Sequence, residues 1–330
     1  MNDLNRRQFL KSTAGLTAFA AAAVSLPGLR GAEAAKPAAM AASKATPGPN
    51  RFHRVGGPKL KTSLNVYSFN NAILGAKDGP PASMTLFDVM EFCARQNFDA
   101  IDPTGYYFPG YPNVPTDDYI AKFKKRAFEL GLDISGTGIR NNFAVADKVA
   151  RAKDVELAKK WIEASAKLGA PVLRVFAGAE APGANRDEIY KWMAEDLRTI
   201  AEHGKKFGVI VGVQNHSDFL RTAEQTIKLV EMVNSEWLGV ILDTGNYPGD
   251  PYAEIAAVLP YTVNFQIKES PYGKDSPVRL DLNRFVKIVR DAGYRGYLPI
   301  ETLSVKDVPY DPLKIVPAFH AEVVAAFNRA

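Results

Sequence analysis

Short apolar segments alternate with longer amphipathic segments along the chain from about residue 64 onward. Short runs rich in Val, Ile and Leu, bounded by turn residues, are typical of buried strands, whereas apolar residues at a 3.6-residue period indicate helices. Strands are predicted at residues 64–67, 100–102, 133–136, 172–176, 209–213, 238–242, 262–266 and 297–300. Helices are predicted at about residues 86–96, 117–130, 149–168, 186–207, 222–233, 282–292 and 314–327. This alternation favours a parallel sheet covered by helices.

Eight strands with intervening helices fit a closed barrel, so we expect an α/β chain with a single (β/α)8 TIM barrel. The alternative is an open doubly wound sheet, which often begins with a glycine-rich turn after its first strand. Here the first strand leads into Ser68-Phe69-Asn70-Asn71, which contains no glycine. The closed barrel is therefore the better interpretation.

The first 34 residues follow a different pattern. The pair Arg6-Arg7 precedes an alanine-rich apolar run at residues 14–26, and small residues stand at 32 and 34. These features predict a secretory signal, and the arginine pair with Phe9-Leu10-Lys11 resembles a twin-arginine motif. A retained membrane anchor is the alternative, but the run is shorter than the roughly 20 residues that span a bilayer. We expect passage through the twin-arginine translocase, cleavage, no stable membrane insertion, and a periplasmic or extracellular location.

Composition sets the remaining boundaries. Residues 1–34 are predicted to be the signal peptide, residues 35–58, rich in Ala, Lys and Pro, a disordered linker, and residues 59–330 the barrel. The formal net charge is +5, and no block of like charges appears, so we expect no nucleic-acid partner. The single cysteine, Cys93, excludes an internal disulfide. Nothing in the pattern predicts an oligomeric state.

Candidate chemistry lies at the strand ends, because the site of a (β/α)8 barrel is built at the carboxyl ends of its strands. Six polar or aromatic residues there are candidates for binding a substrate: Tyr67, Asp102, Tyr106, Arg174, Asn215 and Asn246. A buried arginine needs a partner, either a structural carboxylate or a substrate group. Aromatic faces can stack on the apolar faces of sugars. A small-molecule carbohydrate is therefore the expected partner.

Three segments carry a family resemblance: Val213-Gln214-Asn215-His216, Leu242-Asp243-Thr244-Gly245-Asn246 and Ile300-Glu301-Thr302. They resemble strand ends of the xylose isomerase-like barrel superfamily, in its sugar isomerase/epimerase branch, and the resemblance spans roughly residues 60–325. It implies a divalent metal, such as Mn²⁺, Mg²⁺ or Zn²⁺, held by Glu, Asp, His and Glu. The corresponding positions here are Gln214, Asp243, Gln266 and Glu301.

The two glutamines change what the resemblance implies. Two amides with two carboxylates form a weaker site of oxygen ligands, so both a bound metal and a metal-free pocket stay open. Family epimerases use two glutamates as bases, and a glutamine cannot accept the proton. The expected catalytic residues are therefore Glu301, His216 as a second acid or base, and Lys268.

The predicted function is an exported sugar isomerase/epimerase-like enzyme. Its substrate would be a non-phosphorylated sugar or keto-sugar derivative, and its intermediate would be of the enediolate type. Isomerase, epimerase and lyase activities all stay open, and the loss of one base favours a lyase over a symmetrical epimerase. The alternative is a non-catalytic periplasmic sugar-binding protein that has lost the family's metal site.

Overall fold

The computed structural model describes residues 51–76, 80–180, 183–216, 218–305 and 308–329. The predicted signal peptide at 1–34 lies outside these residues, as does the predicted linker up to residue 50. Residues 51–58 form no helix or strand, yet Phe52 N donates to Pro260 O at 3.0 Å, and the Arg54 guanidinium lies 4.6 Å from the centre of the Tyr294 ring. No described helix is long and apolar enough to cross a membrane.

The strands are all parallel and form two hydrogen-bonded groups. One group, in spatial order, contains β3 (Asp133–Ile134), β2 (Ala100–Asp102), β1 (Lys59–Asn65) and β9 (Arg295–Ile300). The other contains β4 (Thr137–Gly138), β5 (Val172–Phe176), β6 (Ile210–Gln214), β7 (Leu238–Asp243) and β8 (Thr262–Gln266). A parallel bridge between Ile267 and Ile300 joins the groups at one edge, and β3 runs on into β4 at the other. The predicted (β/α)8 TIM barrel is confirmed.

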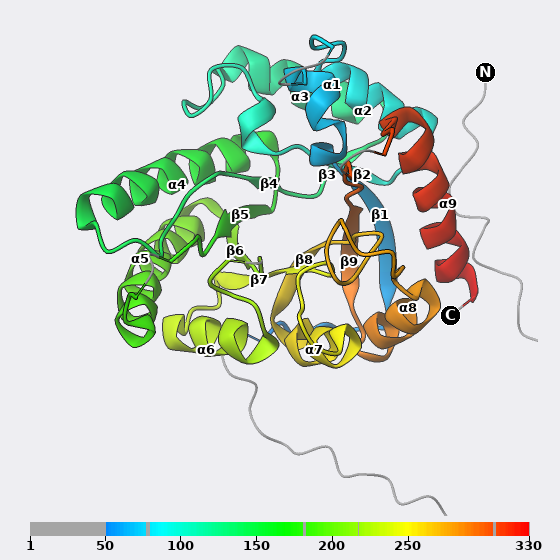
Figure 1. Ribbon diagram of the computed structural model, residues 1–330. Coiled ribbons are helices and arrows are strands. Elements are labelled where there is room, and N and C mark those ends of the chain that lie inside the picture. The colour runs from blue at the N-terminus through cyan, green and yellow to red at the C-terminus, as the bar shows by residue number, and fades with distance from the viewer. Residues whose placement is uncertain (1–50, 77–79, 181–182, 217, 306–307, 330) are drawn as a thin grey trace, which may run out of the picture. The chain divides into compact units, whose positions relative to one another are not determined.

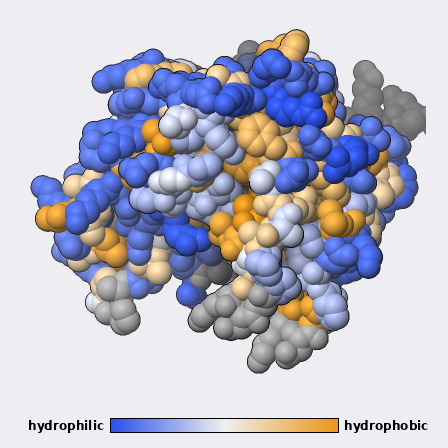
Figure 2. Space-filling view, turned by 90° about the horizontal axis from the view of Figure 1, so that it is seen from above, coloured by the Kyte–Doolittle hydropathy of each residue, from blue (hydrophilic) through white to orange (hydrophobic). Residues whose placement is uncertain are grey.

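Helices surround the strands (Figure 1). They are α1 (Asn70–Leu74), α2 (Leu86–Arg95), α3 (Asp117–Glu129), α4 (Lys148–Leu168), α5 (Arg186–Phe207), α6 (Ala223–Val233), α7 (Pro251–Val258), α8 (Leu282–Asp291) and α9 (Pro312–Arg329). In α8 the buried residues Leu282, Phe285, Val286 and Val289 follow the spacing of one helical face. Hydrophilic residues dominate the face shown in Figure 2, where hydrophobic residues appear in separate groups. The apolar face of α8 is thus buried in the protein interior.

The third predicted strand, 133–136, is interrupted. Strand β3 ends at Ile134, although Ser135 N still donates to Ile101 O at 2.9 Å, and β4 begins at Thr137. The Ser135 hydroxyl lies 2.8 Å from the Ser63 hydroxyl and 3.3 Å from the Asp102 carboxylate. Asn264 Nδ2 also donates to Asp102 Oδ2, at 3.1 Å. These hydrogen-bonded side chains form a polar layer beneath the strand ends. The first strand is also displaced from the prediction, since it ends at Asn65 and Tyr67 lies in a 3-10 turn, η1 (Val66–Phe69).

Candidate active site

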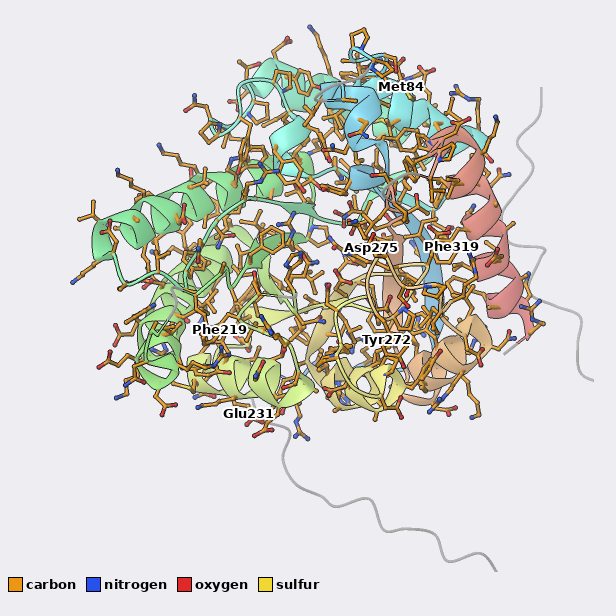
Figure 3. All side chains as sticks on the ribbon, in the orientation of Figure 1. Met84, Phe219, Glu231, Tyr272, Asp275 and Phe319 are labelled. Carbon is orange, nitrogen blue, oxygen red and sulfur yellow. The ribbon has the colours of Figure 1, made fainter. Side chains whose placement is uncertain are left out.

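A cavity of about 260 Å³ lies at the carboxyl ends of the strands. It is lined by Asn65, Tyr67, Tyr106, Arg140, Arg174, Phe176, Gln214, His216, Gln266, Lys268, Lys274, Glu301 and Leu303. A second cavity of about 590 Å³ shares His216, Lys268, Lys274 and Leu303 with the first. Tyr272 and Asp275, labelled in Figure 3, line this second cavity from the loop between β8 and α8. The polar lining lies at the carboxyl ends of the strands, the end of the barrel where (β/α)8 enzymes have their active sites.

Lys268 links two carboxylates at the centre of the site. Its Nζ lies 3.0 Å from Asp243 Oδ2 and 3.8 Å from Glu301 Oε2. The Asp243 side chain is fully buried, and those of Lys268 and Glu301 are 11% and 7% exposed. A Cβ at Gly245 would lie 2.7 Å from Lys268 Cδ, so a glycine at 245 leaves the room that the lysine side chain fills. The arrangement is a buried ammonium held by one carboxylate, with a second close by.

The electrostatics of this cluster keep the lysine charged. Burial lowers the pKa of Lys268, but the nearby Asp243 and Glu301 carboxylates outweigh burial, and the pKa is raised. Burial raises the pKa of Glu301, and the Lys268 ammonium partly opposes that rise. A carboxylate with a raised pKa is a better proton acceptor near neutral pH than an ordinary one.

Gln214 and Gln266 join the same cluster through an amide group. Gln214 Nε2 donates to Asp243 Oδ2 and to Gln266 Oε1, both at 2.7 Å. The other oxygen of Asp243 accepts from Gly245 N at 2.9 Å. Gln214 Oε1 is buried and has no partner among the described residues. The groups that converge here are therefore the Gln214 amide NH₂ and the Lys268 ammonium, which act as donors, and the oxygens of Asp243 and Gln266, which accept their hydrogen bonds.

This arrangement does not fit a divalent metal. The predicted ligands Gln214, Asp243 and Gln266 do converge, but Asp243 Oδ2 already accepts from an ammonium and an amide. The Lys268 ammonium takes the place that a cation bridging Asp243 and Glu301 would need. Within the part of the chain that the structure describes, no group of three or more His, Cys, Asp or Glu could hold a metal ion.

His216 follows the end of β6 by two residues and lines the same cavity as this cluster. Its Nδ1 lies 3.7 Å from Asp218 Oδ2, and its ring meets the Phe176 ring edge-on, with the centroids 5.1 Å apart. Burial lowers the pKa of His216, which favours the neutral imidazole. A neutral imidazole beside a carboxylate can exchange a proton with a ligand in either cavity.

The predicted substrate residues divide into two groups. Tyr67, Tyr106 and Arg174 line the first cavity, and Asn246 lines the second. Asn215 and Asp102 line neither. Asn215 Nδ2 donates to Asp243 O at 2.9 Å, and Asn215 Oδ1 accepts from Asp243 N at 2.8 Å, so Asn215 ties β6 to β7. Asp102 belongs to the polar layer beneath the strand ends.

Several lining residues were not among the predicted site residues. Asn65 and Phe176 lie at the ends of β1 and β5, where the barrel rule alone could have found them. Arg140 follows β4 by two residues, in the same kind of position. Lys274 and Leu303 lie in loops beyond the strand ends, where periodicity gives no position.

Comparisons with known proteins agree with this architecture. A family model described as "Xylose isomerase-like TIM barrel" matches residues 90–317. The solved structure of 3-keto-D-glucoside 4-epimerase from E. coli is 13% identical, with a TM-score of 0.64 over 81% of this chain and 99% of that chain. The structure of L-ribulose 3-epimerase is 20% identical, with a TM-score of 0.66 over 82% and 95%. That of D-psicose 3-epimerase from Clostridium cellulolyticum H10 is 16% identical, with a TM-score of 0.67 over 81% and 99%.

At these identities the likeness to the solved structures shows the fold alone. None of the curated proteins compared with the chain matches it.

Proposed function

The chain belongs to the xylose isomerase-like TIM barrel family, and we propose that it is a carbohydrate isomerase or epimerase, or a lyase using the same first step. The observation that carries the proposal is the ammonium of Lys268, which lies between Asp243 and Glu301 on a cavity wall. The three solved structures compared above are named as epimerases of ketoses and of a keto-glucoside, which agrees with chemistry beside a carbonyl.

The proposed first step breaks a C–H bond beside the substrate carbonyl. Glu301 takes the proton, the electron pair of the C–H bond forms a C=C bond, and the π pair of the carbonyl moves onto its oxygen to give an enediolate-type anion. Lys268 donates a hydrogen bond to that oxygen, while Asp243 holds the lysine in position. In a site shielded from water, a fixed positive charge stabilises such an anion strongly. The lysine thus supplies the charge that a metal would otherwise supply.

The second step decides the product. Return of the proton from Glu301 to the former carbonyl carbon, while the hydroxyl proton of the enediolate passes to the former carbonyl oxygen, gives isomerisation. Delivery of a proton to the other face of the original carbon by His216 that has first been protonated, which leaves the imidazole neutral and Glu301 protonated, gives epimerisation. If the carbon on the other side of the deprotonated carbon, away from the carbonyl, carries a leaving group, that group departs with its bonding electron pair and the reaction is an elimination. His216 lines both cavities, so it has access to a ligand that Glu301 contacts.

The size of the cavity supports a small substrate. About 260 Å³ lies just below the range of roughly 300–1,000 Å³ that is common for small-molecule pockets. Tyr67, Tyr106 and Phe176 line the cavity and contribute apolar surface for a sugar. A monosaccharide derivative therefore suits the site better than an oligosaccharide.

Hydrogen exchange tests the proposed first step. The purified protein is incubated in D₂O with a panel of ketoses, keto-glucosides and keto-sugar acids, and ¹H NMR follows the proton beside the carbonyl. We expect that proton to be replaced by deuterium, and the Glu301→Gln variant to lose at least about 100-fold in rate, the lower range for a general base. Glu322→Gln, which removes a half-exposed glutamate on α9, is the matched control and should keep the rate. Exchange that is undiminished in Glu301→Gln, or absent from every compound, contradicts the proposal.

A sugar-binding protein without catalysis is the second candidate. The observation in its favour is that Gln214 and Lys268 already donate to Asp243 and Gln266, at the positions where the family resemblance implies metal ligands. A binding protein would bind sugars equally well before and after Glu301→Gln and would exchange no proton in either form.

Export is part of the same proposal and rests on the leader sequence, which lies outside the described residues. The Arg6-Arg7 pair and the apolar run at residues 14–26 support a twin-arginine signal. Expression of the full chain, followed by separation of periplasm and cytoplasm, tests it. Replacing both arginines by lysine should leave the protein in the cytoplasm at its uncleaved length.

A further inference from the structure

Two guanidinium groups on the cavity wall lack a carboxylate partner. Arg174 is 4% exposed, its Nη1 donates to Ile139 O at 2.6 Å, and its buried Nε has no acceptor among the described residues. The side chain of Arg140 has neither a hydrogen bond nor an ion pair within the described ranges. An arginine has five N–H donors, so most of the donors of this pair are free for a ligand.

Aromatic rings hold both guanidinium groups in place. The Arg174 guanidinium lies 4.0 Å from the centre of the Phe176 ring, and that of Arg140 lies 4.9 Å from the centre of the Tyr106 ring. Stacking of this kind fixes the plane of a guanidinium while leaving its edge open. Both arginines and both rings line the same cavity.

The backbone is shaped to admit Arg174. Gly138 on β4 pairs with Arg174 on β5, and a Cβ at Gly138 would lie 2.7 Å from Arg174 Nε and 2.8 Å from its Cζ. A residue with a side chain at 138 would therefore push the guanidinium aside. Arg140 follows Gly138 by two residues, so the two arginines reach the cavity from the neighbouring strands β4 and β5.

The other charges around the cavity have partners. Lys268 contacts Asp243 and lies near Glu301, and Lys274 Nζ contacts Asp275 at 2.8 Å. Asp102 attracts Arg174 at longer range, but its carboxylate accepts hydrogen bonds from Ser135 and Asn264 and forms no ion pair with a described residue. The unpaired positive charge on the wall is thus concentrated at Arg140 and Arg174.

We propose that Arg140 and Arg174 form an anion subsite and that the substrate is a sugar acid, a carbohydrate that carries a carboxylate. A planar carboxylate matches the fork of a guanidinium and would partner the buried charge that Arg174 leaves uncompensated. The inference rests on the proposed function, since it places the carboxylate at the β4–β5 side of the cavity and the reacting carbon at Glu301. Phosphate shares the same affinity for guanidinium groups, so the test includes both anions.

Calorimetry with matched ligand pairs tests the subsite on the full chain. The probes are hexuronates and hexonates, each compared with its uncharged parent sugar, and D-glucose 6-phosphate is compared with D-glucose. We expect at least one acid to bind at least tenfold more tightly than its parent, with the difference shrinking as salt rises. If no acid binds more tightly than its uncharged parent sugar, the inference is overturned. A sugar phosphate that binds more tightly than every acid also overturns the assignment of a carboxylate.

Two variants test whether the preference for the acid depends on the two arginines of the proposed subsite. Arg174→Gln and Arg140→Gln should each weaken binding of the acid by about 10- to 100-fold and leave the uncharged parent unchanged. Arg140 is exposed, so its variant gives the answer even if Arg174→Gln fails to fold. Arg95→Gln, at an exposed arginine on α2, is the control. Unchanged affinity for the acid in Arg140→Gln overturns the inference.

The exchange assay distinguishes failure of this inference from failure of the proposed function. Acids that bind with the expected preference but exchange no proton contradict the enzyme and leave the anion subsite standing. Exchange on uncharged keto-sugars, without preference for any acid, supports the enzyme and overturns the subsite.

Discussion

Replacing Asp102 by asparagine is expected to change how the stability of the barrel depends on pH. Asp102 is 7% exposed, and its Oδ2 accepts hydrogen bonds from Ser135 and Asn264. Burial raises its pKa from 3.8 to about 6, and the positive charge of Arg174 opposes only part of that rise. The folded protein therefore binds this proton more tightly than the unfolded chain does.

The sign and size of the effect follow from linkage. The stability that Asp102 contributes is fully present below pH 3.8, where both states are protonated, and is lost as the pH rises through about 6. Since one pKa unit corresponds to about 1.4 kcal/mol, the loss amounts to about 3 kcal/mol of unfolding free energy. Asparagine never ionises, so the stability of the variant relative to wild type should rise by about that amount between pH 4 and pH 7.

Urea unfolding at a series of pH values from 4 to 7.5 measures this difference directly. The amide hydrogens of the introduced asparagine need new acceptors, which adds a cost of about 1–3 kcal/mol that does not vary with pH, so the slope is the readout. Asp133→Asn is the control: hydrogen bonds from Tyr297 and Lys61 lower the pKa of Asp133 below 3.8, so its contribution to stability is lost only at lower pH and the difference from wild type should stay nearly flat from pH 4 to 7.5. A difference between Asp102→Asn and wild type that stays flat from pH 4 to 7 refutes the reasoning.

Three further predictions concern separate parts of the barrel. Gly138→Ala should displace the Arg174 guanidinium and weaken sugar-acid binding about tenfold in calorimetry, with uncharged sugars unaffected. Lys268→Met should destabilise the fold by about 3–5 kcal/mol in urea unfolding, because it leaves Asp243 buried and unpaired, and adding Asp243→Asn should recover most of the loss. Burial lowers the pKa of His320 to about 4, so about 3 kcal/mol of stability is lost as the pH falls from 6.5 toward 4, and His320→Phe should abolish that loss.

The regular elements could be predicted where the local signals were strong. β8 (Thr262–Gln266) and α5 (Arg186–Phe207) have the predicted bounds. For α5 the end signals are clear, because the helix starts after the capping Asn185 and ends at Gly208, which has a left-handed conformation. Pattern alone missed α7 (Pro251–Val258), although Asp250 caps it and a proline occupies its first position. The five-residue α1 (Asn70–Leu74) carries no such signal.

The sequence predicted where the site lies in the barrel, but not which of its side chains contact one another. The barrel rule brings strand ends together, which is why Glu301, Lys268, Gln214 and Gln266 share a cavity. Side chains alternate along a strand, so Gln214 faces the cavity while the adjacent Asn215 bonds to β7 instead.

The contact of Lys268 with Asp243 depends on side-chain positions that no one-dimensional pattern contains. The sequence resemblance implied metal ligands at positions where the structure places a network of an amide, an ammonium and carboxylates.

In the proposed reaction the Lys268 ammonium, held by Asp243, supplies the positive charge for proton transfer by Glu301. Its sharpest test measures deuterium exchange at the carbon beside the carbonyl of an active keto-sugar, with chelator-treated protein and with added Mn²⁺ or Mg²⁺. We predict the same rate in both conditions and a loss of at least about 100-fold in Lys268→Met, the effect of removing one strong oxyanion donor. A rate that requires the divalent ion and survives Lys268→Met would contradict this role for the lysine.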